Sequence, residues 1–484
     1  MNRKLRAPLT LLASLAFVGA MVAAGPAQAL PHGPRLRVFA PSPSLTESRY
    51  RVKQRISVDT GVWVSASGSP FEVITHRDTY RSPIVATQVI DPGTSAHTVV
   101  LPDWVVADGW SGFRRFFDVT VTGPTGAVVF HGPVRFCADS WNVQRADDTG
   151  PMTPSFPQGC YANPFTKGVV WGIDQGWAVG ALDLANIRFG GPDGTYAVQV
   201  RVTPAYQQLF GIAPADASAS FDLVVSTRQS CNPCKPAATA ATTGSSQSLP
   251  TRTNPRPSTL PDLVALPAWG ISVNEYSEPG RDFLDFGATV WDAGPAPMVV
   301  EGFRRPGTAV MDAWQTFYRG DKPVARAPVG TLEYDADPGH EHWHFTQFAA
   351  YRLLGADKHQ VVRSQKEGFC LAPTDAIDLT LPGAVWNPGA IGLWSACGDA
   401  SAIWTRETLP AGWGDTYFQS LPGQSFDITD LPNGTYFIQV QADPTGEIYE
   451  RSSTNDTQVR EVILGGVPGN RTVTVPPWHG IDTG

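Results

Sequence analysis

Apolar and polar residues alternate along much of this chain, with the period of two that is typical of β-strands. Residues 117–121 (FDVTV) and 198–202 (VQVRV) alternate strictly, and Gly, Pro, Asp and Asn bound such runs. Apolar residues at helical spacing are scarce. One turn pattern occurs twice, because 192–196 (PDGTY) and 432–436 (PNGTY) each open an alternating run. The pattern predicts an all-β protein built from antiparallel sandwiches.

Length and composition favour several loop-rich β domains. The 484 residues are too many for one hydrophobic core, and 43 Pro, 47 Gly and only 17% charged residues are typical of β structure with many turns. Between residues 235 and 260 Ala, Thr, Ser and Pro dominate. We therefore predict an accessory, immunoglobulin-like β-sandwich over residues 30–234, a flexible linker over 235–260, a second β-rich domain over 261–465 and a tail over 466–484.

The first 29 residues have the three parts of a signal peptide. A basic start precedes an apolar run over residues 9–24 and the small residues Ala27-Gln28-Ala29. A membrane anchor is the alternative, but the run is short, and no later stretch is apolar enough to span a bilayer. Cleavage after Ala29 removes three bases and changes the formal net charge from −8 to −11. We predict a secreted protein without a membrane span, whose acidity disfavours nucleic acid and favours partners with a primary ammonium group.

Six cysteines in an exported chain indicate disulfides rather than thiol chemistry. Four of them lie in the N-terminal half, where they allow three pairings, and we favour Cys137 with Cys160 and Cys231 with Cys234. A redox or metal role is the alternative for the spacing of Cys231 and Cys234, but a linker rather than a helix follows it. The structural interpretation is therefore preferred.

Three of the nine histidines occupy alternate positions in His340-Glu341-His342-Trp343-His344. On a strand their imidazoles would line one face, although three ligands on one ion would require a bend or bulge. An all-histidine set suits copper or zinc, and copper(II) forms the tighter complexes. The alternatives are a surface cluster of histidines and a mononuclear zinc hydrolase, for which the sequence shows neither an H-E-x-x-H helix nor a base beside the motif.

Over residues 261–465 the chain resembles the catalytic domain of lysyl oxidases, which are copper-dependent amine oxidases. The resemblance consists of short segments in the family's order. These segments are Pro261-Asp262-Leu263-Val264, the three histidines, and residues 348–354 (FAAYRLL), 366–370 (KEGFC), 415–417 (DTY), 426–430 (FDITD), 433–436 (NGTY) and 450–456 (ERSSTND). The predicted second domain is thus lysyl oxidase-like.

The resemblance implies a lysyl tyrosylquinone cofactor made from Lys366 and Tyr417, with copper on His340, His342 and His344 as the oxidant. Copper and dioxygen would oxidise the phenol to a quinone, and the nearby ε-amine would attack the ring. The implied activity is oxidative deamination of primary amines, either peptidyl lysine or small amines, to aldehydes with release of hydrogen peroxide and ammonia. An extracellular protein is thus a candidate substrate.

A general base must take the α-proton of the amine, and a carboxylate suits that task. Asp415, two residues before Tyr417, is our candidate, with turn capping as its alternative role, and Asp427 is second.

The family's calcium site corresponds by position to Asp262, Glu450, Asn455 and Asp456. Ser452 and Ser453 stand where the family has an acid and an aromatic residue. The second domain has only two cysteines where animal members have many, so Cys370 with Cys397 would be the remaining bridge.

A different hypothesis keeps the fold and the histidines but not the turnover. The chain would then be a non-catalytic, secreted copper-binding or adhesion module, and a covalent link between Lys366 and Tyr417 would distinguish the two hypotheses. The N-terminal region shows no metal motif or nucleophile, so we interpret it as an accessory domain with a targeting role. Trp104, Trp110 and Trp141 are its candidate binding aromatics, with core packing as the alternative.

Overall fold

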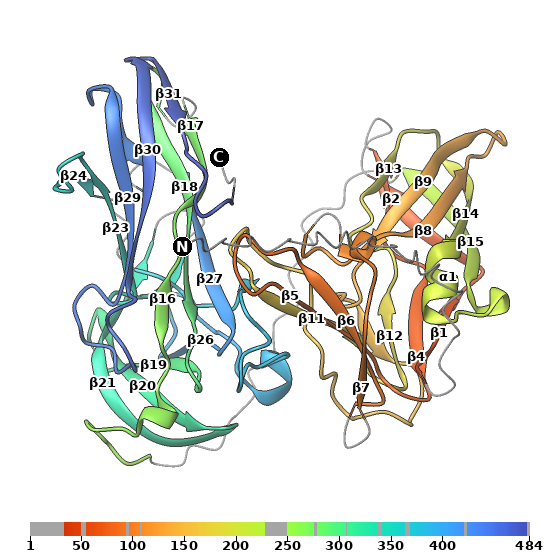
Figure 1. The fold of residues 1–484 in the computed structure, drawn as a ribbon, viewed down its shortest axis with the longest axis horizontal. Coiled ribbons are helices and arrows are strands. Elements are labelled where there is room, and N and C mark those ends of the chain that lie inside the picture. Colours follow the sequence, from red (N-terminus) through yellow and green to blue (C-terminus); the bar gives the residue numbers. More distant parts are fainter. Residues whose placement is uncertain are drawn as a thin grey trace, which may run out of the picture.

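The structure is a computed structural model and describes residues 33–49, 55–92, 96–106, 109–227, 249–274, 278–305, 307–336, 341–363, 368–420 and 424–481. Figure 1 shows two lobes side by side, one formed by the N-terminal half of the chain and one by the C-terminal half. Within the described ranges α1 (Pro204–Phe210) is the only α-helix, and the all-β prediction is therefore confirmed. No helix among these residues is long and apolar enough to cross a membrane.

Within the described ranges, the N-terminal lobe contains four sheets. In spatial order, the first sheet contains β1 (Arg35–Phe39), β4 (Trp63–Ser67), β12 (Trp177–Gly180) and β10 (Val143–Arg145), and the second contains β11 (Gly168–Ile173), β5 (Phe71–His76), β6 (Val85–Ile90) and β7 (His97–Val100). The third is the pair β13 (Ile187–Phe189) and β3 (Ile56–Val58). The fourth contains β2 (Ser44–Arg49), β15 (Ser218–Thr227), β14 (Gly194–Val202), β8 (Phe113–Thr122) and β9 (Val128–Phe136). The short helices η1 (Asp103–Val106) and η2 (Pro214–Asp216) lie in connections. Only β2 and β15 pair in parallel among the described strands.

The C-terminal lobe contains three sheets, all antiparallel within the described ranges. In spatial order, the first sheet contains β16 (Leu263–Ala265), β18 (Phe283–Asp292), β27 (Trp413–Gln419) and β25 (Asp375–Ala376), and β17 (Trp269–Asn274) and β28 (Phe426–Asp427) also pair with β18. The second contains β22 (His342–Phe345), β21 (Lys322–Asp335), β20 (Val310–Arg319), β19 (Met298–Arg304) and β26 (Trp404–Leu409). The third contains β24 (Gln360–Arg363), β23 (Ala349–Leu354), β29 (Gly434–Ala442), β30 (Thr457–Val467) and β31 (Asn470–Thr474). The helices η3 (Pro257–Thr259) and η4 (Pro388–Ile391) lie outside the sheets.

The repeated turn pattern opens a strand in each lobe, as predicted. β14 and β29 begin at its glycine, and inward residues alternate with outward ones along both strands. The Tyr196 hydroxyl donates to the Pro192 carbonyl at 2.6 Å, and the Tyr436 hydroxyl donates to the Pro432 carbonyl at 2.8 Å. Such a tyrosine corner is a feature of immunoglobulin-like sandwiches. The immunoglobulin-like arrangement of the N-terminal lobe itself stays a prediction.

Two of the three predicted disulfides are confirmed. Cys137 is bonded to Cys160 and Cys370 to Cys397, with Cα atoms 6.0 and 5.9 Å apart. The third pair, formed by residues 231 and 234, lies outside the described residues.

The end of the predicted linker and most of the predicted tail pack on the lobes. Thr251 forms a bridge with Arg326 of β21, and Leu260 is buried. β30 runs on to residue 467 and pairs with β31, after which Trp478 packs 5.4 Å from the ring of Phe165. A large, partly buried aromatic side chain that packs in this way fixes a chain end that polar composition would leave free.

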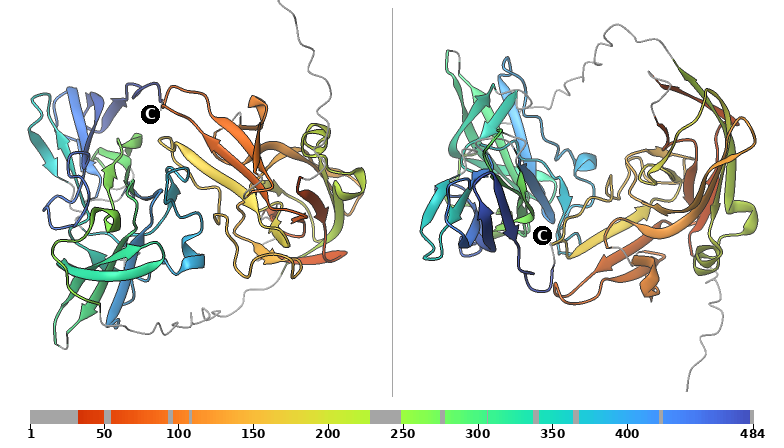
Figure 2. Two further views of the ribbon diagram at one scale, coloured as in Figure 1. Left: turned by 60° about the horizontal axis from the view of Figure 1, so that its bottom comes forward. Right: turned by 90° about the horizontal axis from the view of Figure 1, so that it is seen from above.

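The two lobes are in contact along residues 161–168, which lead into β11. The Lys167 amide donates to the Ile377 carbonyl at 2.6 Å, and the Leu379 amide donates to the Gly168 carbonyl at 2.9 Å. Gly168 and Asp378 form an isolated parallel bridge between the lobes. Figure 2 shows the two lobes from two further directions, with the yellow β11 beginning next to the C-terminal lobe.

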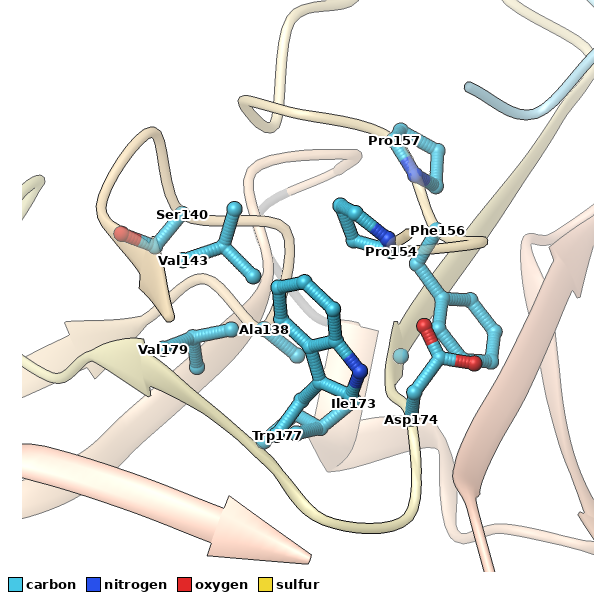
Figure 3. A pocket seen from close by; sticks show the side chains of 11 residues that line it. Ala138, Ser140, Val143, Pro154, Phe156, Pro157, Ile173, Asp174, Trp177 and Val179 are labelled. Atoms are coloured by element: carbon cyan, nitrogen blue, oxygen red, sulfur yellow. The ribbon is translucent and has the colours of Figure 1, made fainter. Parts of the chain in front are cut away.

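A small pocket lies inside the N-terminal lobe. Figure 3 shows Phe156, Val179 and the indole of Trp177 around it, with the carboxylate of Asp174 at its edge. That carboxylate accepts a hydrogen bond from the Ser155 amide at 2.6 Å, and burial raises its pKa. None of the predicted site residues lines the pocket, so it is a gap in the packing of the accessory lobe rather than part of the candidate site.

Candidate active site

β22 carries two of the three predicted copper ligands. It pairs with β21, where Asp335 lies opposite His342. The imidazoles of His342 and His344 converge on one face, since their Nε2 atoms are 2.9 Å apart, whereas Trp343 is fully buried. The third predicted ligand, His340, lies outside the described residues.

The spacing of the two imidazoles fits a shared ion. Two nitrogens bound at about 2.0–2.1 Å would lie about 2.9 Å apart at a right angle and about 3.4 Å apart at the tetrahedral angle. The Nε2 atoms of His342 and His344, 2.9 Å apart, are within hydrogen-bond distance of each other in the structure, and this separation is short enough for both to bind one ion. Asp335 Oδ2 lies 3.5 Å from His344 Nδ1, where a carboxylate can orient a metal-binding imidazole. Within the described ranges alone, no three His, Cys, Asp or Glu residues are placed to hold a metal.

Two disulfide-linked segments border the free edge of β22. Phe369 exchanges backbone hydrogen bonds of 2.8 and 3.1 Å with Phe345, and the Trp343 amide donates to the Cys397 carbonyl at 3.0 Å. Cys397 is bonded to Cys370, the residue after Phe369. The disulfide predicted from the resemblance thus links the two segments that border β22, the strand of His342 and His344.

Gly368 is the first described residue after the predicted cofactor lysine. A Cβ atom on Gly368 would lie 2.8 Å from the Cβ of His344, so only glycine permits this close approach. Lys366, two residues earlier in the sequence, lies outside the described residues. The chain that follows the predicted lysine is therefore in contact with the histidine strand.

The phenol of Tyr417 is fixed by the same segment. Its hydroxyl donates to the Cys370 carbonyl at 2.8 Å and accepts from the Cys370 amide at 3.0 Å. The ring of Phe369 packs edge-on at 5.1 Å. Burial, with the carboxylates of Asp415 and Glu407 nearby, raises the pKa of the Tyr417 phenol well above its ordinary value. A neutral phenol is thus held beside the chain that covers the histidine strand.

Two buried carboxyl groups accompany this phenol. Asp415 is 2% exposed and, two residues from Tyr417 on β27, shares its face of the strand. Glu407 of β26 is fully buried, and its Oε2 accepts from the Leu371 amide at 3.0 Å. Burial raises the pKa of Glu407 well above its ordinary value, and the neighbouring charge of Asp415 adds to the shift. Asp415 was predicted at this place, whereas Glu407 was not.

Asp427, the second candidate base, lies further along the sheet. Asp427 pairs with Phe283 on β18, whereas Tyr417 pairs with Ala288. Five residues of an antiparallel strand extend about 17 Å. Asp415 is therefore the better placed of the two candidates.

The predicted calcium ligands meet where the start of β16 contacts residues 450–456. Asn455 Nδ2 donates to Asp262 Oδ1 at 3.1 Å, and a backbone amide of β16 donates to Glu450 Oε2 at 2.9 Å. Burial and the charges of Asp456, Asp443 and Asp262 raise the pKa of Glu450 to about 8. Burial and the charges of Asp443 and Asp262 raise the pKa of Asp456 to about 6.

This acidic cluster contains oxygens that lack partners. Glu450 Oε1, Asn455 Oδ1 and Asp456 Oδ1 are buried without a hydrogen-bond partner. Clustered oxygens of this kind suit a hard cation such as calcium. In the described part of the chain, no three His, Cys, Asp or Glu residues are placed to hold a metal ion by themselves, so calcium binding here would also need amide or water oxygens.

Asp335, Glu407 and Asp443 are the acidic residues of these sites that sequence reasoning missed. One signal was available for Glu407, because alternation along β26 buries Thr405, Glu407 and Leu409 together. An acid at an inward position is rare unless it has a role. For Asp335 and Asp443 we find no local signal.

Comparisons with known proteins place the candidate site in one family. The sequence profile of the family "Lysyl oxidase" matches residues 326–468, which include the three histidines, Lys366, Asp415, Tyr417 and residues 450–456. Lysyl oxidase homolog 4 of Mus musculus is 30% identical over 118 residues, which are 24% of this chain and 14% of the relative. Lysyl oxidase homolog 2 of Xenopus tropicalis is 30% identical over 119 residues, which are 24% of this chain and 13% of the relative.

A third relative gives the same coverage. Lysyl oxidase homolog 3B of Danio rerio is 28% identical over 118 residues, or 24% of this chain and 13% of the relative. The chain thus spans about one seventh of the length of these curated relatives. The match lies in the lobe that carries the histidines and Tyr417. The C-terminal half of this chain therefore belongs to the lysyl oxidase family.

Proposed function

We propose that this chain is a secreted copper amine oxidase of the lysyl oxidase type. It would convert a primary amine, dioxygen and water to an aldehyde, ammonia and hydrogen peroxide. The observation that carries the proposal is the position of the segment 368–371. This segment borders the strand of His342 and His344, and its Cys370 backbone holds the Tyr417 hydroxyl by two hydrogen bonds.

The metal would be held by His340, His342 and His344. The two described imidazoles fit adjacent positions on one copper ion, and Asp335 would orient His344. Bound copper, together with dioxygen, would supply the oxidising power that converts the Tyr417 phenol to a quinone.

Lys366 would contribute the amine that is linked to the Tyr417 ring. Once formed, the quinone supplies an electrophilic carbonyl and accepts the electrons of the substrate amine. Asp415, on the same face of β27 as Tyr417, is the proposed base, and its carboxylate would hold the proton lost from the α-carbon of the amine. The buried rings of Phe345 and Phe369 would exclude water from this step.

Two features support export of the protein. Residues 1–29 have the pattern of a signal peptide, although they lie outside the described residues. Disulfides are formed in both lobes, and such bonds persist in oxidising compartments. We propose an extracellular protein or a small diffusible amine as the substrate.

Peptide mapping of protein matured with copper and dioxygen is the direct test. We expect the peptides that contain Lys366 and Tyr417 to be joined by a covalent bond, since the proposed cofactor is built from both side chains. Mass spectrometry after digestion would detect the joined pair. Recovery of two separate peptides from copper-loaded protein would favour the alternative function, a non-catalytic copper-binding or adhesion module.

Calcium should stabilise the protein through the acidic cluster of Asp262, Glu450 and Asp456. We expect millimolar calcium to raise Tm by about 2–4 °C for each kcal/mol of binding free energy, because the ion offsets repulsion among the carboxylates. Ser452 stands where the family has an acid, so Ser452→Asp should increase the calcium-dependent rise. Differential scanning calorimetry measures both effects.

The matched control for this prediction is Ser42→Asp, which adds the same charge to a position of the other lobe that is half-buried, as Ser452 is. It should leave the calcium-dependent rise unchanged. A Tm that does not respond to calcium in either the wild-type protein or Ser452→Asp would contradict a calcium site here.

A further inference from the structure

Thr416 separates the proposed base from the proposed cofactor tyrosine and faces the other side of β27. Its Oγ1 lies 2.8 Å from Oγ1 of Thr289, a fully buried residue of β18. The same hydroxyl donates to the carboxylate of Asp375 on β25. β25 pairs with β27 at Gly414 and Trp413, before the strand reaches Tyr417. β18 pairs with β27 from Gly414 to Gln419, and the hydroxyl network adds a side-chain connection from Thr416 to β25.

The N-terminal lobe supplies the next members of this network. Asn163, 3% exposed, donates from Nδ2 to Thr289 Oγ1 at 3.3 Å and also bonds to the Asp375 side chain. Thr166 is fully buried, and its Oγ1 donates to the carbonyl of Ala376 at 2.7 Å and accepts from the Asn163 amide at 3.1 Å. Buried hydrogen bonds of this kind thus connect the accessory lobe to the back of β27.

The segment that carries Asn163 and Thr166 is itself fixed. The disulfide between Cys137 and Cys160 anchors its start. Phe165 is fully buried and packs in one hydrophobic cluster with Leu266 and Ile377 of the C-terminal lobe. A buried aromatic anchor surrounded by backbone pairing is typical of contacts that carry much of an interface's energy.

We propose that the N-terminal lobe is a positioning element of the active site. Asn163 and Thr166 hold β25 and Thr416 on the back of β27. Because neighbouring residues of a strand project to opposite faces, fixing Thr416 also fixes Asp415 and Tyr417 on the front. The roles of Asp415 and Tyr417 rest on the proposed function, whereas the support of β27 by the accessory lobe does not.

The test compares matched variants of the full chain. Thr166→Val removes the hydroxyl that crosses between the lobes, and Thr166→Ser restores it. Thr75→Val is the control, because Thr75 is equally buried and its hydroxyl also donates to a backbone carbonyl, that of Val169, but within the N-terminal lobe. Asn163→Leu, a second interface variant, decides the question if Thr166→Val does not fold.

Hydrogen–deuterium exchange of the peptide 413–419 is the first measurement. We expect exchange about fivefold to tenfold faster in Thr166→Val and Asn163→Leu, as the loss of a buried hydrogen bond predicts, and wild-type exchange in Thr166→Ser and Thr75→Val. The yield of the joined Lys366 and Tyr417 peptides, the second measurement, should fall in the same two variants. Wild-type exchange in β27 of both interface variants would overturn the proposal.

The two measurements separate this inference from the proposed function. If the wild-type protein yields no joined peptides, the proposed function fails, while the exchange rates still decide whether the N-terminal lobe supports β27. If the peptides are joined in wild type and equally in both interface variants, with unchanged exchange, the enzyme stands and the positioning role is wrong.

Discussion

Tyr417→Phe is expected to abolish the release of hydrogen peroxide from primary amines while the fold and the copper content are retained. Phenylalanine has no phenolic oxygen, so no quinone can form from it. The change also leaves the amide and carbonyl of Cys370 without their bonds to the hydroxyl, which should cost about 1–3 kcal/mol of unfolding free energy. A coupled peroxidase assay measures the activity, and elemental analysis measures the copper.

The chain offers a matched control in Tyr436→Phe. Tyr436 lies in the same lobe and is 7% exposed, and its hydroxyl also donates to a backbone carbonyl, that of Pro432. This variant should lose a similar amount of stability and keep its activity. Undiminished peroxide release from Tyr417→Phe would rule out the proposed cofactor, whatever the control shows.

His342→Ala should reduce the affinity for copper by at least about tenfold to a hundredfold. Removing a residue that only orients a metal ligand already has an effect of that size, and His342 is itself a proposed ligand. His342 Nε2 lies 2.9 Å from His344 Nε2, so its removal takes away one of two converging donors. Without the oxidant, the peptides of Lys366 and Tyr417 should remain separate. Copper titration monitored by electron paramagnetic resonance measures affinity and ligand geometry together.

Two further variants make the copper prediction specific. His359→Ala removes an exposed histidine of the same lobe and should leave copper affinity unchanged. Asp335→Asn weakens the contact with His344 Nδ1 and should give an intermediate affinity. Full copper binding and normal crosslink formation in His342→Ala would show that the metal lies elsewhere.

The charge states of the buried carboxyl groups affect the ionisation of the Tyr417 phenol. Glu407 and Asp415 share an apolar region with the Tyr417 phenol, and each negative charge there disfavours ionisation of the phenol. A metal ion bound near Tyr417 would have the opposite effect and lower the pKa of the phenol, because a cation favours the ionised form. The proposed oxidation of Tyr417 is therefore expected to depend on prior copper loading, as the separate-peptide outcome in His342→Ala would show.

The sequence by itself determined the local structure. Strict alternation predicted strands such as β8 and β14, because a period of two places one set of side chains in the core. The turn pattern at 192–196 and 432–436 predicted where β14 and β29 begin. The order of the motifs indicated the family of the C-terminal half. The cysteine positions favoured the pair Cys137 and Cys160, and the resemblance implied the pair Cys370 and Cys397.

Only the tertiary structure decided which strands lie together and what their inward polar residues contact. Alternation assigns a residue to a face but does not specify the partner strand or its register. The positions of Glu407 beside Tyr417 and of Asp335 beside His344 depend on pairings between strands far apart in sequence. The contact of Asn163 with Thr289 depends on the docking of two lobes, which no local pattern encodes, because that docking is determined by the shapes and hydrogen-bonding groups of two complete surfaces.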